Sequence, residues 1–243
     1  MANANEKLNA YYREIANTFP PKVQQTLKMI ADPPLELLAL RRYVIMEKEL
    51  DARWVWSAQQ IRDFENSALF KKTQVQIDKV KKAFQELNPG YTLGSSPIRD
   101  LNSQVKLWKR NKKVHAAADY VKRECLKEIV DYPDVPDLPA TKKFRVFLRD
   151  CPAIPKPTSA APGLSDHGQM HAVDFVVMKD GKTIAGTDTS TMEGVWNAPG
   201  WTRKLKEAVT SSASLFEGPL KDPPEAWHYT LRNASAEPKK RKA

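Results

Sequence analysis

The spacing of apolar residues changes along this 243-residue chain, and the change constrains its fold more than any other feature. In the first third, side chains such as Ile77, Val80 and Phe84 recur at the spacing of one helix face. Residues 172–178 are instead β-branched and aromatic, and a Lys-Asp-Gly-Lys turn follows, which predicts a strand and a hairpin. Helices followed by an antiparallel sheet predict an α+β fold with a helical N-terminal segment.

Local signals place several helix ends. Asp32 before a proline predicts a helix N-cap, and Ser57 with Gln60 has the spacing of a capping box. Asn-Pro-Gly at 88–90 predicts the end of a helix.

The middle of the chain is predicted from similar signals. Ser-Pro at 96–97 predicts the start of another helix, and a further helix is expected over 200–215. Residues 132–139 are rich in proline and predict an extended connector. Residues 144–148 alternate between apolar and other residues, which predicts a strand.

Four residues near the C-terminal end have the chemistry of a metal centre. Two imidazoles and one carboxylate, from His167, His228 and Asp174, make the three-ligand set of a catalytic zinc with one open position. Glu225 then remains to take a proton from a water in that position. Side chains three apart on a strand point to opposite faces, so Glu225 and His228 converge only if the chain bends or Glu225 precedes the strand. Glu225 as a partner that orients a ligand is the alternative.

His171 offers a different pairing with His167. The two lie four residues apart, as in a helical zinc site. That site also needs a glutamate directly after the first histidine, where this chain has Gly168. We therefore set this arrangement aside, and the role of His171 stays open.

These residues resemble the motifs of the zinc D-Ala-D-Ala peptidases, a family that includes cell-wall carboxypeptidases, dipeptidases and phage endolysins. The resemblance extends over roughly residues 90–232 and rests on three motifs in the correct order. The matching residues are Ser165, His167, Ala172 and Asp174 in the first motif, Glu225, Trp227 and His228 in the second, and Arg99 with Gln104 in the third. Met170 departs from the family, which has glycine there, and this puts the local loop conformation in question.

The resemblance implies roles and a substrate. Arg99, whose planar fork suits a carbonyl or an oxyanion, would assist catalysis and hold substrate. Gln104 and Ser165 would also bind substrate, although the Ser165 hydroxyl would equally suit a turn. The cofactor would be Zn²⁺ and the substrate a peptidoglycan stem peptide, cut at its terminal D-Ala-D-Ala bond or between L-Ala and D-Glu. An inactive wall-binding or signalling module on the same fold is the alternative.

With this resemblance the chain is expected to have three parts. Residues 1–88 would form the helical N-terminal segment, which is either a docking extension or a layer of the same domain. Residues 89–232 would form the zinc peptidase domain, with its site on an antiparallel sheet. Residues 233–243 would form a basic disordered tail.

The net charge of the chain indicates what kind of partner it binds. A formal net charge of +10 predicts an anionic partner. Charge alone does not distinguish nucleic acid, anionic lipid and acidic wall polymers as that partner. No zinc-finger or other nucleic-acid-binding motif stands out, so nucleic acid is the weakest of these. Two cysteines, Cys125 and Cys151, make no disulfide framework.

The start of the chain predicts how it reaches its substrate. Its first twenty residues lack the apolar run of a signal peptide, and no stretch approaches the roughly 20 apolar residues of a membrane span. A cytoplasmic product is expected that acts in the periplasm or cell wall after phage-type lysis or non-classical export.

Overall fold

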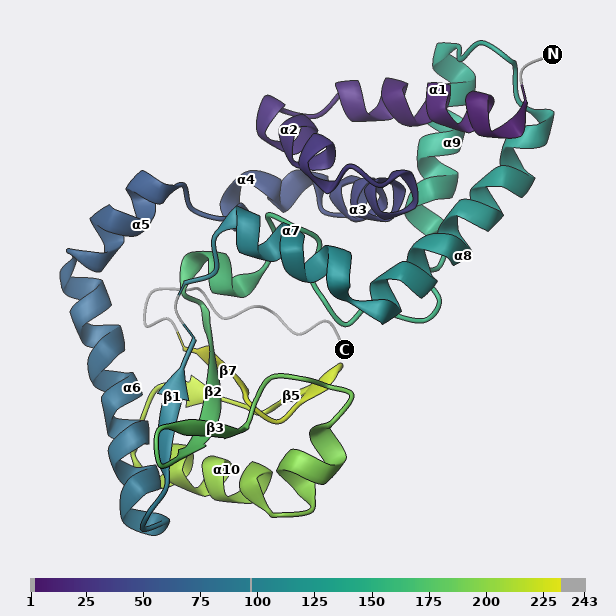
Figure 1. Cartoon of the computed structure of the whole chain (residues 1–243). Helices are drawn as coiled ribbons and strands as arrows, with labels where there is room; N and C mark the ends of the chain where they lie inside the picture. The colour runs from purple at the N-terminus through teal and green to yellow at the C-terminus, as the bar shows by residue number, and fades with distance from the viewer. Residues whose placement is uncertain (1–2, 97, 233–243) are drawn as a thin grey trace, which may run out of the picture. The chain divides into compact units, whose positions relative to one another are not determined.

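A computed structural model describes residues 3–96 and 98–232 of the chain. The tail predicted at 233–243 lies outside these described residues. The chain divides into two compact units, and each combines two separate stretches (Figure 1). We call Met1–Val55 with Asp100–Ser165 the helical unit, and Trp56–Arg99 with the chain from Asp166 onward the sheet unit.

This division differs from the boundary expected at residue 88. Residues 56–88 belong with the sheet, and residues 100–165 belong with the N-terminal helices. Contacts between segments far apart in sequence determine the two units. Changes of composition along the chain do not reveal such contacts.

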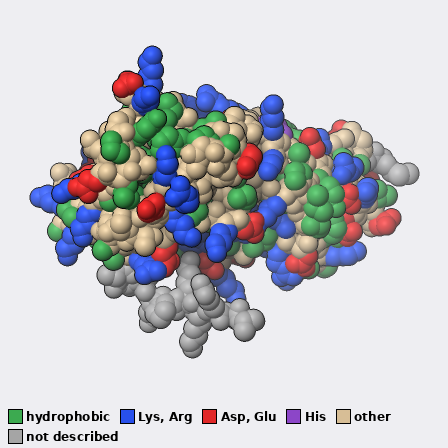
Figure 2. Space-filling view, turned by 90° about the horizontal axis from the view of Figure 1, so that it is seen from below, with side chains coloured by type: hydrophobic (Ala, Val, Ile, Leu, Met, Phe, Trp, Pro, Cys, Tyr) green, Lys and Arg blue, Asp and Glu red, His purple; other side chains and the backbone are tan. Residues whose placement is uncertain are grey.

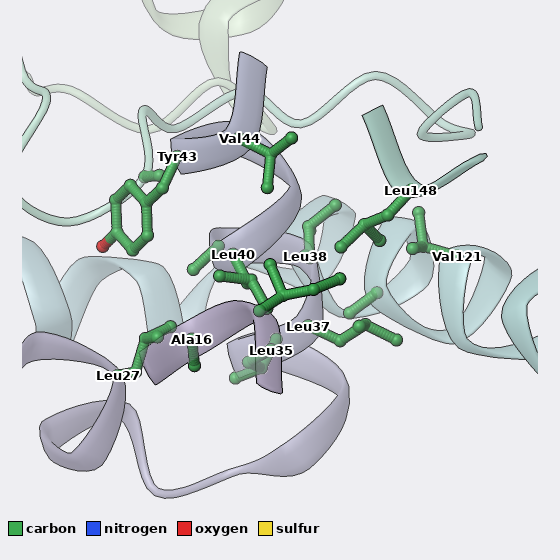
Figure 3. Packing of buried hydrophobic residues seen from close by; sticks show 14 of the residues in the cluster. Ala16, Leu27, Leu35, Leu37, Leu38, Leu40, Tyr43, Val44, Val121 and Leu148 are labelled. Atoms are coloured by element: carbon green, nitrogen blue, oxygen red, sulfur yellow. The ribbon is translucent and has the colours of Figure 1, made fainter. Parts of the chain in front are cut away.

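The helical unit is built around α3 (Pro33–Ile45), a largely apolar helix in which seven of the 13 residues are buried. Leu35, Leu37, Leu38 and Leu40 are each at most 3% exposed, and a helix of this kind is stable only when other helices surround it. Figure 3 shows these leucines packed with Ala16, Leu27, Val121 and Leu148 from the neighbouring helices. The elements of the unit are α1 (Ala4–Asn17), α2 (Pro21–Ile30), α3 (Pro33–Ile45), η1 (Glu47–Glu49), α4 (Leu50–Arg53), α7 (Leu101–Arg110), α8 (Lys112–Glu128), η2 (Ile129–Asp131) and α9 (Leu138–Asp150).

The strand expected at 144–148 is wrong, because these residues belong to helix α9. The Asp137 side chain accepts a hydrogen bond from the Ala140 N–H at 2.7 Å and caps this helix. Phe144 and Leu148 are buried four residues apart, whereas Val146 between them is 49% exposed. A strand would bury all three on one face, so the burial follows the helical period.

The sheet unit combines an antiparallel sheet with helices. Its long helices α6 (Ala68–Leu87) and α10 (Trp201–Ser211) pack on each other, with the rings of Phe84 and Trp201 6.0 Å apart at their centroids. The elements of the unit are α5 (Ala58–Glu65), α6 (Ala68–Leu87), β1 (Thr92–Ser95), η3 (Asp166–Gln169), β2 (Ala172–Lys179), β3 (Lys182–Ala185), η4 (Glu193–Asn197), α10 (Trp201–Ser211), β4 (Phe216–Glu217), β5 (Leu220–Lys221), β6 (Pro224–Glu225) and β7 (His228–Leu231).

Strand β2 is central in this unit. The sheet has the order β1-β2-β7-β4, with β3 also paired to β2, and every pairing is antiparallel. Short strands β5 and β6 pair separately. The mixture of helices and antiparallel sheet confirms the α+β class, and the caps at Asp32 and Ser57 and the β2–β3 hairpin are also confirmed.

The helix expected to begin at residues 96–97 begins later, so that prediction is wrong. Helix α7 starts at Leu101, and the Asp100 side chain accepts from the Ser103 N–H at 2.7 Å as its cap. Strand β1 was not predicted, and the N–H of Ser96, the residue directly after it, donates to the Asp174 carbonyl at 2.9 Å. Arg99 therefore lies between a strand and a helix.

Basic and acidic side chains are mixed on the surface of the protein. In Figure 2, lysine and arginine side chains lie interspersed with acidic ones over the face shown. None of the described helices is both long and apolar enough to cross a bilayer.

Cys125 and Cys151 are both buried free thiols.

Candidate metal centre

The register between β2 and β7 brings two of the predicted ligands together. Asp174 of β2 lies opposite His228 of β7 in the antiparallel ladder. Directly opposed residues project from the same face of a sheet, with Cβ atoms about 5 Å apart. The side chains therefore meet, and Asp174 Oδ1 lies 3.1 Å from His228 Nδ1.

His167 reaches the same place from η3, the short turn that precedes β2. Its carbonyl accepts from the Arg99 N–H at 3.2 Å, and the neighbouring Gly168 carbonyl accepts from the Trp56 N–H at 3.2 Å. These contacts hold the turn beside the sheet. The ring of His167 lies edge-on to that of His228, with centroids 5.0 Å apart.

The three ligand atoms form a nearly equilateral triangle. His167 Nε2 lies 3.3 Å from Asp174 Oδ1 and 3.3 Å from His228 Nδ1, and the third side is 3.1 Å. Four ligands about 2.05 Å from a tetrahedral zinc ion lie about 3.3 Å from one another, so the triangle has the size of one tetrahedral face. His167 and Asp174 are 4% and 3% exposed. This buried group fits a metal ion.

The pKa shifts of His167 and Asp174 favour the protonation states that bind a cation, whereas the shift of His228 does not. Burial lowers the pKa of His167, which favours a neutral imidazole. Burial alone would raise the pKa of Asp174, but hydrogen bonds with the two imidazoles hold it well below its ordinary value. Burial would lower the pKa of His228, yet Asp174 and Glu225 outweigh it and raise that pKa. A metal ion would therefore displace a proton chiefly from His228.

Glu225 stands at the edge of the triangle and comes from a different strand, β6. The chain bends between β6 and β7, and this brings Glu225 Oε2 to 3.4 Å from His228 Nδ1. Burial raises the pKa of Glu225 to about 7. A carboxyl group with a pKa near neutrality both accepts and returns a proton efficiently at physiological pH. The bend thus explains how Glu225 and His228, three residues apart, face the same site.

Arg99 also reaches the centre, and its side chain contacts a predicted ligand. Its Nη2 donates to Asp174 Oδ2 at 2.9 Å, while Oδ1 of the same carboxylate faces the imidazoles. The side chain of Arg99 is 25% exposed. Sequence reasoning connected Arg99 with substrate and did not foresee this pairing, because residues 99 and 174 meet only in the folded sheet unit.

Gln104 and Ser165 belong to the helical unit. The Gln104 side chain is 4% exposed, and its Oε1 accepts from the Gly163 N–H at 2.8 Å. An added Cβ at Gly163 would lie 2.7 Å from the Trp54 ring, so this loop is tightly packed. Ser165 is buried and is the last residue of the unit. In the structure, Gln104 supports the loop backbone, which is a structural contact.

The backbone of Met170 shows which conformation the loop adopts at the position where the family has glycine. Its φ is 55°, in the left-handed region that glycine adopts without strain. The turn therefore keeps a backbone suited to glycine while carrying a side chain. That side chain is only 6% exposed and belongs to the apolar core of the sheet unit, so its burial offsets the strain.

No protein family model, curated protein or solved structure matches the chain. The case for a function therefore rests on the geometry of the centre. The structure brings together His167, Asp174, His228, Glu225 and Arg99 in one unit. It adds Ser96, which no motif indicated and whose Oγ accepts from the Asp174 N–H at 3.3 Å.

Proposed function

We propose that this protein is a zinc-dependent peptidoglycan hydrolase that cleaves an amide bond of the stem peptide. One observation carries the proposal. The triangle of His167, Asp174 and His228 has the dimensions of a tetrahedral zinc face, and a carboxylate with a pKa near 7 stands beside it. Three protein ligands with one open position are typical of catalytic zinc, whereas structural zinc has four.

The residues would divide the work of hydrolysis as follows. Zinc, when bound, would polarise the scissile carbonyl and make a water acidic enough to lose its proton near pH 7. Glu225 would accept that proton as the water oxygen attacks the carbonyl carbon. When the C–N bond breaks, Glu225 would return the proton to the leaving amine. His167, Asp174 and His228 would hold the ion in place throughout.

The choice of substrate rests on the resemblance to the zinc D-Ala-D-Ala peptidases. The bonds in question are the terminal D-Ala-D-Ala bond and the bond between L-Ala and D-Glu. The position of Glu225 supports an active enzyme over an inactive wall-binding module, because a binding module has no need of a proton acceptor beside the metal. The net charge of +10 also suits acidic wall polymers.

The test is hydrolysis of a purified stem pentapeptide, followed by mass spectrometry of the products. We expect one cleavage, lost on treatment with a chelator and restored by zinc. Release of D-Ala identifies the carboxypeptidase reaction, and release of L-Ala from the other end identifies the endopeptidase reaction. Binding to isolated cell walls without cleavage would instead favour the inactive module. The absence of both cleavage and wall binding would contradict the proposal.

A further inference from the structure

Ser96 and Arg99 contact two of the three candidate ligands. Ser96 and Asp174 exchange two hydrogen bonds, from the Ser96 N–H to the Asp174 carbonyl at 2.9 Å and from the Asp174 N–H to Ser96 Oγ at 3.3 Å. The Arg99 N–H donates to the His167 carbonyl at 3.2 Å. The backbone at Ser96 is thereby joined to β2, and the backbone at Arg99 is joined to η3.

The side chain of Arg99 adds a contact that bears directly on the metal. Its Nη2 holds Oδ2 of Asp174 at 2.9 Å, and the other oxygen, Oδ1, lies 3.3 Å and 3.1 Å from the imidazole nitrogens. A carboxylate without a partner on its second oxygen is able to rotate or to bind a metal through both oxygens. With Oδ2 occupied, only Oδ1 is presented to the triangle.

We infer that Arg99 is a positioning residue for the metal centre, which orients Asp174 so that it binds the ion through Oδ1 alone. This inference rests on the proposed metal centre and differs from a role of Arg99 on substrate. Partners of metal ligands in general orient those ligands and raise the affinity for the metal. Asp174 is buried, so solvent screens its contact with Arg99 only weakly.

Two physical effects of Arg99 on the metal have opposite signs, and this makes the inference testable. A guanidinium near a divalent cation repels it, so charge alone predicts that removal of Arg99 tightens zinc binding. Orientation of Asp174 predicts that the same change weakens zinc binding. An arginine that acts on substrate alone would change turnover and leave zinc affinity as it is.

The experiment is a competition titration of the metal-stripped full chain with zinc against a chromophoric chelator at constant pH. Wild type is compared with Arg99→Met and Arg99→Lys. The control is Arg203→Met, which removes an exposed cation of the same unit. We expect about 10–100-fold weaker zinc binding in Arg99→Met, a smaller loss in Arg99→Lys, and no change in the control. Circular dichroism of each metal-free variant checks folding.

Unchanged or tighter zinc binding in Arg99→Met would overturn the inference. If that variant fails to fold, Arg99→Lys decides, because it keeps a cation beside Asp174 but loses the planar fork. Zinc bound by Arg99→Lys as tightly as by wild type would then overturn it. A wild-type protein that takes up no zinc would refute the metal centre itself, which separates failure of the proposed function from failure of this inference.

Discussion

The two carboxylates of the centre differ because their surroundings differ. Asp174 is in contact with two imidazoles and a guanidinium, so it stays ionised. Glu225 is also shielded from water, but its contact with His228 does not compensate for burial, and its pKa rises to about 7. Environments that separate the pKa values of neighbouring carboxylates assign them different roles. Here they favour Asp174 as ligand and Glu225 as proton acceptor.

Replacement of Glu225 separates these roles. We expect Glu225→Gln to lower turnover by about 10²–10⁴-fold while zinc content stays at the wild-type level, because the amide keeps the size but accepts no proton. His228→Ala should lose both zinc and activity. The measurements are steady-state kinetics on a stem peptide and elemental analysis. Glu207→Gln, an exposed carboxylate on α10, is the matched control. Loss of zinc in Glu225→Gln would make that residue a ligand.

The stability of the metal-free protein should depend on Glu225 between pH 5 and 7. The pKa of this group is about 7 in the folded protein against an ordinary 4.5. Between these values the folded state holds a proton that the unfolded chain has released, so the free energy of unfolding falls as pH rises, by at most about 1.4 kcal/mol per pH unit. The contribution is complete below pH 4.5 and lost above pH 7.

Two histidines also titrate near this range, so the test is a comparison of variants. The raised pKa of His228 acts in the same direction as Glu225, whereas the lowered pKa of His167 favours stability as pH rises toward 6.5. We expect the stability of Glu225→Gln, relative to wild type, to increase from pH 5 to 7 in urea denaturation with a chelator present. Parallel curves for the two proteins would contradict the raised pKa of Glu225.

At the scale of elements, the turn from η3 into β2 sets the direction of two ligands. His167 lies in η3, Asp174 lies in β2, and Met170 between them has a φ of 55°. A residue with a Cβ costs about 1 kcal/mol more than glycine in this region. The buried Met170 side chain contributes more than that through contacts with the core. Packing of the Met170 side chain thus stabilises a turn conformation that glycine would adopt without strain.

Two substitutions at Met170 distinguish strain from packing. Alanine keeps the strained backbone and removes the buried side chain, so we expect Met170→Ala to destabilise the protein by about 2–5 kcal/mol. Glycine also removes the side chain but relieves the strain, so Met170→Gly should be more stable than Met170→Ala by about 1 kcal/mol and less stable than wild type. Urea denaturation of the three proteins gives the order. A glycine variant more stable than wild type would show that strain outweighs packing.

At the scale of the whole molecule, the candidate centre lies within one of two units. Its three ligands and Glu225 all belong to the sheet unit, in which η3, β2, β6 and β7 carry them. A metal ion that binds the folded state alone stabilises it by mass action. Zinc should therefore act as a stabilising ligand for the sheet unit.

We expect one zinc ion per chain, with a rise in stability on binding. At a free zinc concentration a thousand times the dissociation constant, the gain is about 4 kcal/mol. The measurements are elemental analysis and thermal melts with and without zinc. His228→Ala should lose the shift, whereas His115→Ala should keep it, because His115 lies exposed on α8. A shift that persists in His228→Ala would place the ion elsewhere.

Much of the local structure could be predicted from residues close in sequence. The cap at Asp32, the capping box at Ser57 and the hairpin after β2 each depend on a few neighbouring side chains, so their signals are complete in a short window. The strand predicted at 144–148 failed because alternation over five residues also occurs in a helix. The Asp137 cap and tertiary burial of Phe144 and Leu148 select the helix.

The sequence by itself determined which residue types are available to the centre, namely two imidazoles and two carboxylates. Only the tertiary structure decided their geometry. Asp174 and His228 are 54 residues apart and meet because β2 and β7 pair in that register. Arg99 and Asp174 are 75 residues apart and meet because β1 pairs with β2 and the Arg99 N–H bonds to the His167 carbonyl. Strand pairing is non-local, so the backbone hydrogen bonds of the whole sheet, and no single motif, set these distances.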